Sequence, residues 1–407
     1  MQKLKVFFCG WGQKWLLGTL ADNGTDLLFE YSPQALEKGI EFSPRALKLR
    51  AQAYGNFPAY QHRLPGLISD ALPDGWGMLL MDRMFARQGR HRNDISPLDR
   101  LAFIGDRAIG ALTFEPASDI DLSTSDLTLL NLASEVRAVV AGKESAALKE
   151  LALLGGSPQG ARPKVLLQYD TRHKRVSTTP TAKGTPWLVK FQARGEHKEV
   201  CAIEHLYAQL ARDCALDMPP TQYFDLDRQL AGFGAERFDR HGGMRVPVHT
   251  LCGALNTDFR IPGIGYQTFL RATRLLTHSA LEIGKAFERC VFNVVFNNRD
   301  DHAKNFSFRM DETFSWKLAP CYDLTYAEGP GGEHQMDIEG EARNPGKAEL
   351  LKLATTNDLK RDWTAGVIER VASVAGEFNS LAAGYPIRAA TRGRIGKAIE
   401  KNRLRMA

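Results

Sequence analysis

The second half of the chain carries its predicted strands first and most of its predicted helices afterwards. Short apolar stretches at 165–169, 176–179 and 187–191 alternate with charged or Gly/Pro-rich turns, as strands do. Apolar residues at 198–213 and, after two further strand-like stretches, at 279–296 recur at helical spacing. This order predicts an α+β domain in which a sheet-rich lobe precedes a helical lobe.

A smaller β-rich unit is predicted in front of this domain. Residues 5–9, 14–20 and 25–31 have the pattern of strands, and Asn23-Gly24 suits a tight hairpin turn. At 407 residues the chain is long enough for two or three structural units. We expect four segments, which are an N-terminal subdomain at 1–115, a linker and helix at 116–150, a sheet-rich lobe at 151–240 and a helical lobe at 241–407.

Composition indicates an ordinary globular protein, with 43% hydrophobic and 25% charged residues. No stretch approaches the ~18 consecutive apolar residues of a membrane span. The six cysteines are scattered without a C-x-x-C pair, which favours reduced thiols in a cytoplasmic protein over a zinc or disulfide framework. The polar segment 117–126 has the composition of a linker, and residues 128–153 have the pattern of a helix.

The segment 297–323 carries the strongest chemical signal. It contains Asn-Asn-Arg-Asp-Asp-His-Ala-Lys-Asn-Phe and, after a predicted hairpin, Leu-Ala-Pro-Cys-Tyr-Asp-Leu. Phosphoryl transfer needs a carboxylate beside the acceptor hydroxyl and oxygen ligands for Mg²⁺. Asp300 would be the base or the group that orients the hydroxyl, and Asn305 and Asp323 would bind the metal. The alternative is a helix-stop loop followed by an ordinary turn.

Lys190 lies in the apolar stretch Trp187-Leu188-Val189-Lys190-Phe191, where a strand would bury it. A buried lysine needs a partner, and nucleotide phosphates would be one. The alternative is an edge-strand lysine whose amine reaches water. Glu204 on the following predicted helix could pair with it, although a solvated glutamate on a helix face is nearly as consistent with the sequence.

The motifs of 297–306 and 318–324 resemble the catalytic core of the HipA family of bacterial toxin kinases. The resemblance implies a protein-kinase-like two-lobed domain behind a small β-rich N-terminal subdomain. It runs from about residue 5 to 380, and its other motifs follow in the same order at 72–77, 156–164, 187–191 and 235–240.

The resemblance also implies roles for residues outside the catalytic segment. It implies that Ser157 is autophosphorylated, which would expel its loop and silence the enzyme, whereas an ordinary turn serine is the alternative. Two prolines near it, Pro158 and Pro163, would stiffen the loop. The ATP contacts that it implies are Lys190, Gly156, Gly160, Glu236 and Phe238. Three charged residues in the same stretch could equally form a surface ion-pair cluster, namely Arg237, Asp239 and Arg240.

Three residues of the catalytic segment have open roles. His302 would orient a metal-ligating carboxylate, and the alternatives are a general base or a histidine facing solvent. Lys304 would neutralise charge on the transferring phosphoryl group or be solvated. Asp301 receives no role. The basic stretch 388–405 is expected to be a helix, either solvated or in contact with nucleic acid.

By this resemblance the chain is an ATP- and Mg²⁺-dependent serine/threonine protein kinase and the toxin of a toxin–antitoxin pair. Its target would be a translation component such as glutamyl-tRNA synthetase, with growth arrest and persistence as the outcome. A HipB-like helix-turn-helix antitoxin would hold it and bring it to operator DNA. The alternatives are a catalytically silent co-repressor scaffold and a small-molecule or lipid kinase, because Asp300, His302 and Asn305 also match the order found in phosphoinositide kinases.

Overall fold

The first sheet is built from the hairpins that the sequence predicts. The computed structural model describes residues 1–118, 126–156 and 158–407. Gly24 of the Asn-Gly turn has a φ of +93°, which this residue type adopts without steric cost. The antiparallel five-stranded sheet has the order β4-β3-β2-β1-β5 and contains β1 (Lys3–Phe8), β2 (Trp15–Asp22), β3 (Leu27–Tyr31), β4 (Ala53–Tyr54) and β5 (Leu112–Glu115).

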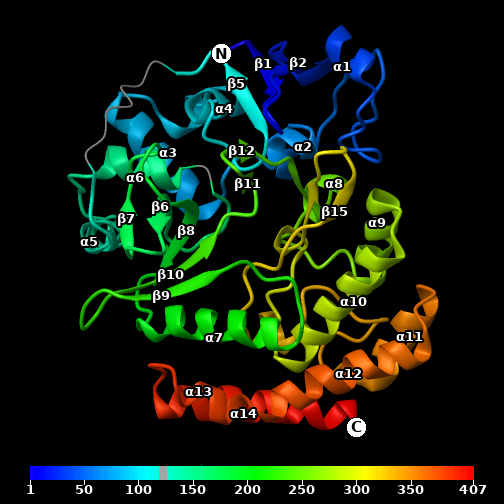
Figure 1. Cartoon of the computed structure of the whole chain (residues 1–407). Coiled ribbons are helices and arrows are strands. Elements are labelled where there is room, and N and C mark those ends of the chain that lie inside the picture. Colours follow the sequence, from blue (N-terminus) through cyan, green and yellow to red (C-terminus); the bar gives the residue numbers. More distant parts are fainter. Residues whose placement is uncertain (119–125, 157) are drawn as a thin grey trace.

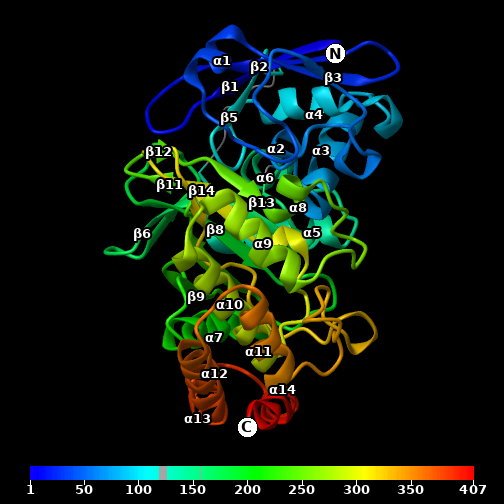
Figure 2. The same ribbon diagram turned by 90° about the vertical axis from the view of Figure 1, so that its right-hand side faces the viewer.

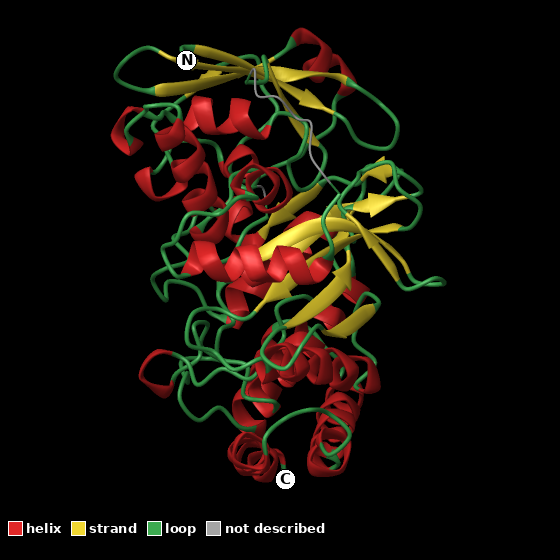
Figure 3. Cartoon of the chain, turned by 90° about the vertical axis from the view of Figure 1, so that its left-hand side faces the viewer, coloured by secondary structure: helices red, strands yellow, loops and turns green. Residues whose placement is uncertain are grey.

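Helices α2 (Gly66–Ser69), α3 (Gly75–Arg87) and α4 (Pro97–Ile104) lie between this sheet and the rest of the chain (Figure 3). Helix α1 (Pro33–Lys38) packs against β2. Ser96 begins α4 with a capping box, in which its hydroxyl and the Asp99 carboxylate satisfy each other's backbone amides.

The segment predicted as one helix at 128–153 forms two helices. α5 (Leu129–Val140) and α6 (Leu148–Gly155) are separated by a turn in which Gly142 has a φ of +80°. The glycine allows the chain to reverse, so that α6 packs against both α3 and the second sheet. Most of the predicted linker, residues 119–125, lies outside the described residues.

The second sheet contains the strands expected for the sheet-rich lobe. It is antiparallel, has the order β7-β6-β8-β10-β9, and contains β6 (Lys164–Asp170), β7 (Arg175–Ser177), β8 (Thr185–Phe191), β9 (Thr221–Asp225) and β10 (Ala231–Glu236). The long helix α7 (Glu199–Asp213) packs against β9 and β10.

The helical lobe follows. Its most buried helix is α10 (Ala280–Val295), which packs against its neighbours α9 (Tyr266–Thr277) and α12 (Arg361–Gly376). The remaining elements are α8 (Leu251–Leu255), α11 (Lys347–Thr356), α13 (Phe378–Ala382), α14 (Ala389–Arg403), the hairpin β11 (Arg240–His241) and β12 (Met244–Arg245), and the small sheet β13 (Val248–Thr250), β14 (Ser307–Met310) and β15 (Trp316–Leu318).

Figures 1 and 2 show the N-terminal sheet at one end of the molecule, the C-terminal helices at the other and the second sheet between them. The predicted fold class, a two-lobed α+β domain behind a small β-rich subdomain, is therefore confirmed. The boundaries at 115, 150 and 240 stay predictions. Among the helices of the described residues, none combines the length and the apolar character needed to cross a lipid bilayer.

A buried carboxylate joins the N-terminal subdomain to the connection between the lobes. Asp239 is 3% exposed and accepts hydrogen bonds from Arg237, from Arg240 and from the Gly110 amide. Desolvation opposes its ionisation, but the two arginines outweigh it and hold the pKa of Asp239 well below its usual range. Arg245 adds hydrogen bonds to backbone carbonyls between residues 106 and 112. These groups thus form a buried interface rather than a surface ion-pair cluster.

We expect Asp239→Asn to destabilise the protein by about 3–5 kcal/mol, because it leaves two largely buried guanidinium groups without a charged partner. Denaturant unfolding would measure the change. The matched control is Asp225→Asn, which removes an ion pair with Lys198 whose carboxylate is 60% exposed. That variant should change stability by less than about 1 kcal/mol. Equal losses in the two variants would contradict the buried interface.

Candidate active site

The catalytic segment begins where α10 ends. Asn297 adopts a left-handed φ of 55°, which terminates the helix and turns the chain away from its axis. Asn298 is 2% exposed, and its side-chain amide donates to the Asn293 side chain of α10 at 2.9 Å. The loop is therefore attached to the most buried helix of the lobe before its chemically active residues begin.

Asp301, to which the sequence assigned no role, anchors this loop. Its carboxylate is fully buried and accepts hydrogen bonds from the Tyr266 hydroxyl at 2.8 Å, from His334 Nδ1 at 2.7 Å and from the Gln335 amide at 2.8 Å. Asn293 donates to the same tyrosine hydroxyl. One carboxylate thus joins the loop to α9, α10 and the segment before α11.

The neighbouring Asp300 faces the opposite way, with 58% of its side chain exposed. His302 Nε2 lies 3.7 Å from its Oδ1, and the Asn305 side-chain amide donates to its backbone carbonyl at 2.6 Å. His302 Nδ1 is buried and has no hydrogen-bond partner among the described residues. The ring of His302 lies 5.3 Å from that of Phe259, so the histidine is held within the site rather than extended into solvent.

Despite this exposure, the surroundings raise the pKa of Asp300 above its ordinary value. Desolvation by the walls of the site is the main cause, and the like charges of Asp323 and Asp301 add to it, while His302 opposes the shift. A raised pKa makes a carboxylate a better proton acceptor. The position and electrostatics of Asp300 therefore suit a group that orients or deprotonates an acceptor hydroxyl.

Lys190 lies between two carboxylates. It is 8% exposed on β8, and its ammonium group donates to Glu204 of α7 at 2.6 Å and to Asp323. Desolvation opposes its charge, but Asp323 and Glu204 outweigh that effect and raise the pKa of Lys190. Glu204 is 3% exposed, so it is the buried partner of Lys190 and not a solvated helix-face residue.

Asp323 is the partner of Lys190 from the helical lobe. Its φ of 56° is a left-handed conformation that aspartate adopts more readily than most residues, and such backbone strain is concentrated at functional sites. Desolvation opposes its ionisation, but Lys190 and Lys164 hold the pKa of Asp323 well below its usual range. The preceding Tyr322 hydroxyl donates to the Lys304 carbonyl at 2.6 Å and thereby joins the segment around Asp323 to the catalytic loop.

A second buried lysine stands beside Lys190. Lys164 of β6 is 2% exposed and pairs directly with Lys190 in the register of the two antiparallel strands. Desolvation and repulsion by Lys190 lower the pKa of Lys164 to about 8, although Asp323 partly offsets the shift. Lys164 Nζ donates to the Gln159 carbonyl, and among the described residues it has no direct carboxylate partner, so its ammonium group suits an anionic ligand such as a phosphate chain.

The glycine-rich loop that precedes Lys164 lies next to the ammonium group of this lysine. Gly160 has a φ of +103°, which residues other than glycine rarely adopt, and a Cβ atom there would lie 2.0 Å from Lys164 Nζ and displace the lysine. Gly156 caps the end of α6. Ser157, the predicted phosphorylation site, lies outside the described residues.

The predicted adenine contacts lie at the junction of the lobes. The amides of Glu236 and Arg237 donate to the carbonyls of Pro220 and Pro186 at 2.9 Å. The Phe238 ring lies 5.7 Å from that of Tyr322, next to Asp323. The segment therefore borders the same site, although two of its backbone donors are already engaged, and the adenine role stays a prediction.

The oxygen donors at this site suit Mg²⁺. Among the described residues, no group of three or more His, Cys, Asp or Glu side chains could hold a metal by itself. Mg²⁺ is usually bound by one or two protein oxygens together with substrate phosphates. The Asp323 carboxylate supplies one, and Asn305, whose amide nitrogen is engaged by Asp300, has its side-chain oxygen left for another.

The structure thus brings together the predicted residues Lys190, Asp300, His302, Asn305 and Asp323. Sequence reasoning did not assign Lys164, Asp301 or Tyr322, although all three lie within quoted motifs. Their place within those motifs was the signal that the sequence offered. It did not indicate their roles, because these depend on partners from distant segments.

Two family models match the chain. Residues 156–378 match the family model described as the HipA-like C-terminal domain, and residues 11–115 match the HipA N-terminal domain. Over 259 residues the chain is 29% identical to "Putative kinase Y4mE" of Sinorhizobium fredii, covering 57% of each protein. The chain therefore aligns with little more than half the length of that curated relative.

Among solved structures, a chain of the Shewanella oneidensis MR-1 toxin–antitoxin complex of HipA, HipB and operator DNA has the same fold. Its TM-score is 0.70 at 17% identity, and the superposition covers 99% of this chain and 96% of that chain. The proinflammatory kinase CtkA of Helicobacter pylori is a weaker match, with a TM-score of 0.40 at 10% identity over 55% of this chain and 89% of that chain.

The two adjacent aspartates should respond differently to truncation. We expect Asp301→Ala to cost about 3–5 kcal/mol of stability, since it leaves buried donors on two distant segments unsatisfied. Asp300→Ala should change stability by less than about 1 kcal/mol, because its carboxylate is largely exposed. Urea unfolding of both variants tests this. The assignment of Asp301 as the anchor is wrong if both variants unfold at the wild-type midpoint.

Proposed function

The chain belongs to the HipA family, and on that premise we propose that it is an ATP- and Mg²⁺-dependent serine/threonine protein kinase. The observation that carries the proposal is the contact of Lys190 with both Glu204 and Asp323. A buried lysine held by two carboxylates, beside a loop with an exposed aspartate, is an arrangement suited to binding phosphates and transferring one of them.

Each residue has a role that follows from its surroundings. Lys190 and Lys164 would neutralise the phosphates of the nucleotide, and the Gly156–Gly160 loop would cover them. Asp300 would accept or orient the proton of the acceptor hydroxyl, which suits its raised pKa and its exposure. His302, 3.7 Å from that carboxylate, would hold its orientation. Asn305 and Asp323 would hold Mg²⁺, which supplies positive charge to the phosphate oxygens when bound.

The biological part of the proposal rests on family membership. We propose that the chain is a toxin held by a HipB-like helix-turn-helix antitoxin, which would bring it to operator DNA. Its target would be a translation component such as glutamyl-tRNA synthetase. Autophosphorylation of Ser157 would inactivate it, because a phosphate with nearly two negative charges would repel the phosphates of ATP.

Incubation with radiolabelled ATP, Mg²⁺ and a generic serine/threonine protein substrate tests the kinase activity. Asp300→Asn should lower label transfer by roughly 10²-fold or more, because it removes the group that assists the acceptor hydroxyl. Lys190→Ala should weaken ATP binding as well. The matched control is Asp358→Asn, which alters a carboxylate that is 81% exposed on the helical lobe. Absence of label with every protein, the wild type included, would favour a silent scaffold.

Phosphopeptide mass spectrometry of the purified protein, before and after incubation with ATP, tests the proposed regulation. We expect one phosphate on the peptide that contains Ser157 in the wild type and none in Asp300→Asn. A phosphate elsewhere, with Ser157 unmodified, would contradict self-inactivation at this position while leaving the kinase activity intact.

ATP affinity should also depend on pH through Lys164, whose pKa of about 8 means that it loses its charge in the alkaline range. A bound phosphate favours the protonated amine, so the Kd for ATP should be constant below about pH 7. It should rise above pH 8 by up to about tenfold per pH unit. Calorimetric titration at several pH values measures this. Lys164→Met should bind ATP more weakly at neutral pH and show a flat profile.

A further inference from the structure

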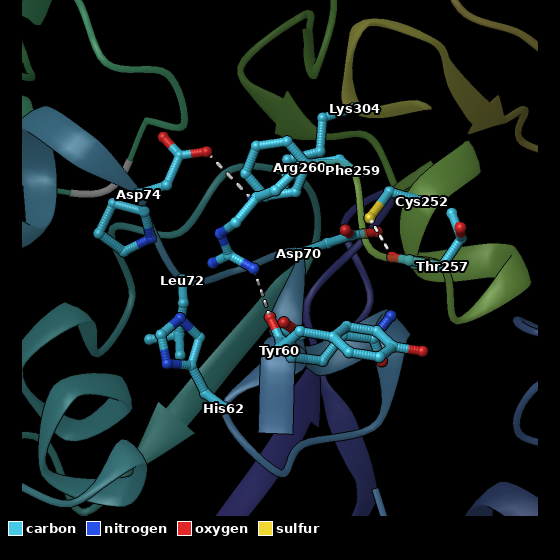
Figure 4. A pocket seen from close by; sticks show the side chains of 14 residues that line it. Tyr60, His62, Asp70, Leu72, Asp74, Cys252, Thr257, Phe259, Arg260 and Lys304 are labelled. Carbon is cyan, nitrogen blue, oxygen red and sulfur yellow. Dashed lines mark hydrogen bonds and ion pairs between the residues drawn. The ribbon is translucent and has the colours of Figure 1, made fainter. Parts of the chain in front are cut away.

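The N-terminal subdomain places one carboxylate, Asp74, at the edge of the candidate active site. Asp74 Oδ1 accepts a hydrogen bond from the Gly160 amide of the glycine-rich loop. Its Oδ2 lies 3.1 Å from the ammonium group of Lys304 in the catalytic loop. Figure 4 shows Asp74 directed at Lys304 across the wall of a small cavity. One side chain of the N-terminal subdomain therefore connects both halves of the site.

The two partners of Asp74 are groups that ordinarily bind phosphate. A backbone amide in a glycine-rich loop and a lysine in a catalytic loop both donate hydrogen bonds to phosphoryl oxygens. We propose that Asp74 occupies the position of the terminal phosphate of ATP, so that nucleotide binding must displace it. This inference rests on the proposed function, because it assumes that the site binds ATP.

The position of Asp74 at the start of α3 supports this assignment. It is the N-cap residue of that helix, where an aspartate side chain normally accepts a hydrogen bond from the first turn. Here the side chain makes no such bond and instead reaches Gly160 and Lys304. The unused cap is a ready second position for the carboxylate, because rotation of the side chain would let it bond the Gly77 amide, whereas the Trp76 amide already donates to the Gly160 carbonyl.

The backbone on both sides of Asp74 is fixed by other contacts. Trp76 Nε1 donates to the Lys164 carbonyl at 2.9 Å, and Gln159 donates to the Asp70 carbonyl at 2.8 Å. A Cβ atom on Gly75 would lie 2.6 Å from Ala161 Cα, so the two segments pack in direct contact. Displacement of the Asp74 side chain therefore leaves the subdomain docked on the glycine-rich loop.

Lys304 is also held from a second side. Its ammonium group lies 4.4 Å from the centre of the Phe259 ring, which favours a cation at that position. The lysine would thus stay at the site after Asp74 leaves and would be free to bind a phosphate. Because Lys304 belongs to the catalytic loop, that phosphate is the terminal one, and the competition acts on ATP rather than on ADP.

The test measures the affinity of the purified full chain for a non-hydrolysable ATP analogue and for ADP, each with Mg²⁺, by calorimetric titration. The variants are Asp74→Asn and Asp74→Ser, because both residues can still cap α3. We expect the affinity for the ATP analogue to increase by roughly fivefold or more, since the competing charge is gone, and the affinity for ADP to change by less than about twofold.

The matched control is Asp258→Asn, which removes a carboxylate that pairs with Arg260 beside the same cavity. It should leave both affinities unchanged. If the wild type binds the ATP analogue but the Asp74 variants bind it equally or more weakly, Asp74 is not a competitor and this inference fails alone. If neither the wild type nor the variants bind the analogue, the proposed function fails and the inference fails with it.

Discussion

The contact of the Lys190 ammonium group with Glu204 and Asp323 is the interaction on which the rest of the site depends. A lysine that is 8% exposed is stable as a cation only if its partners replace the lost hydration. Glu204 fixes α7 against the second sheet, and Asp323 brings in the end of the helical lobe. The Lys190 ammonium group therefore holds the two lobes together at this point and places charged groups in the space between them. These partners hold the ammonium group of Lys190 in a fixed orientation, as a preorganised phosphate-binding group requires.

Much of the fold could be predicted because strand and helix periodicities are local properties of the sequence. Strands β1–β3 and β6–β8 and the helices at 198–213 and 279–296 lie within a few residues of their predicted positions, whereas the short edge strand β4 was not predicted. The prediction of a single helix at 128–153 was wrong, because the segment forms two helices. The break around Gly142 is stabilised by packing of α6 on α3 and β6, which no local pattern encodes. The sequence also left Glu204 undecided, because a buried and a solvated glutamate occupy the same helical positions.

The residues that sequence reasoning left unassigned are those whose partners are remote. Asp301 meets Tyr266 and His334, and Asp74 meets Lys304 from 230 positions away. None of these partners forms a recognisable motif with it, and aspartate beside a glycine or a histidine is common in ordinary turns. Asp300 could be predicted because the order of Asp300, Asn305 and Asp323 is typical of kinases. Asp301 could not be predicted, since a buried anchoring aspartate and a solvent-exposed aspartate look the same in a sequence.

The direct pairing of Lys164 with Lys190 restricts how this sheet can vary between related proteins. Side chains alternate between the two faces of a strand, so adding or deleting one residue within β6 or β8 would turn one lysine away from the other. The stretch between these strands, residues 171–184, carries no such constraint beyond its pairing with the edge of β6. We therefore expect changes of chain length to accumulate in that stretch. The distance between Gly160 and Lys164 should stay fixed, because the same strand register that aligns the two lysines also positions the glycine-rich loop.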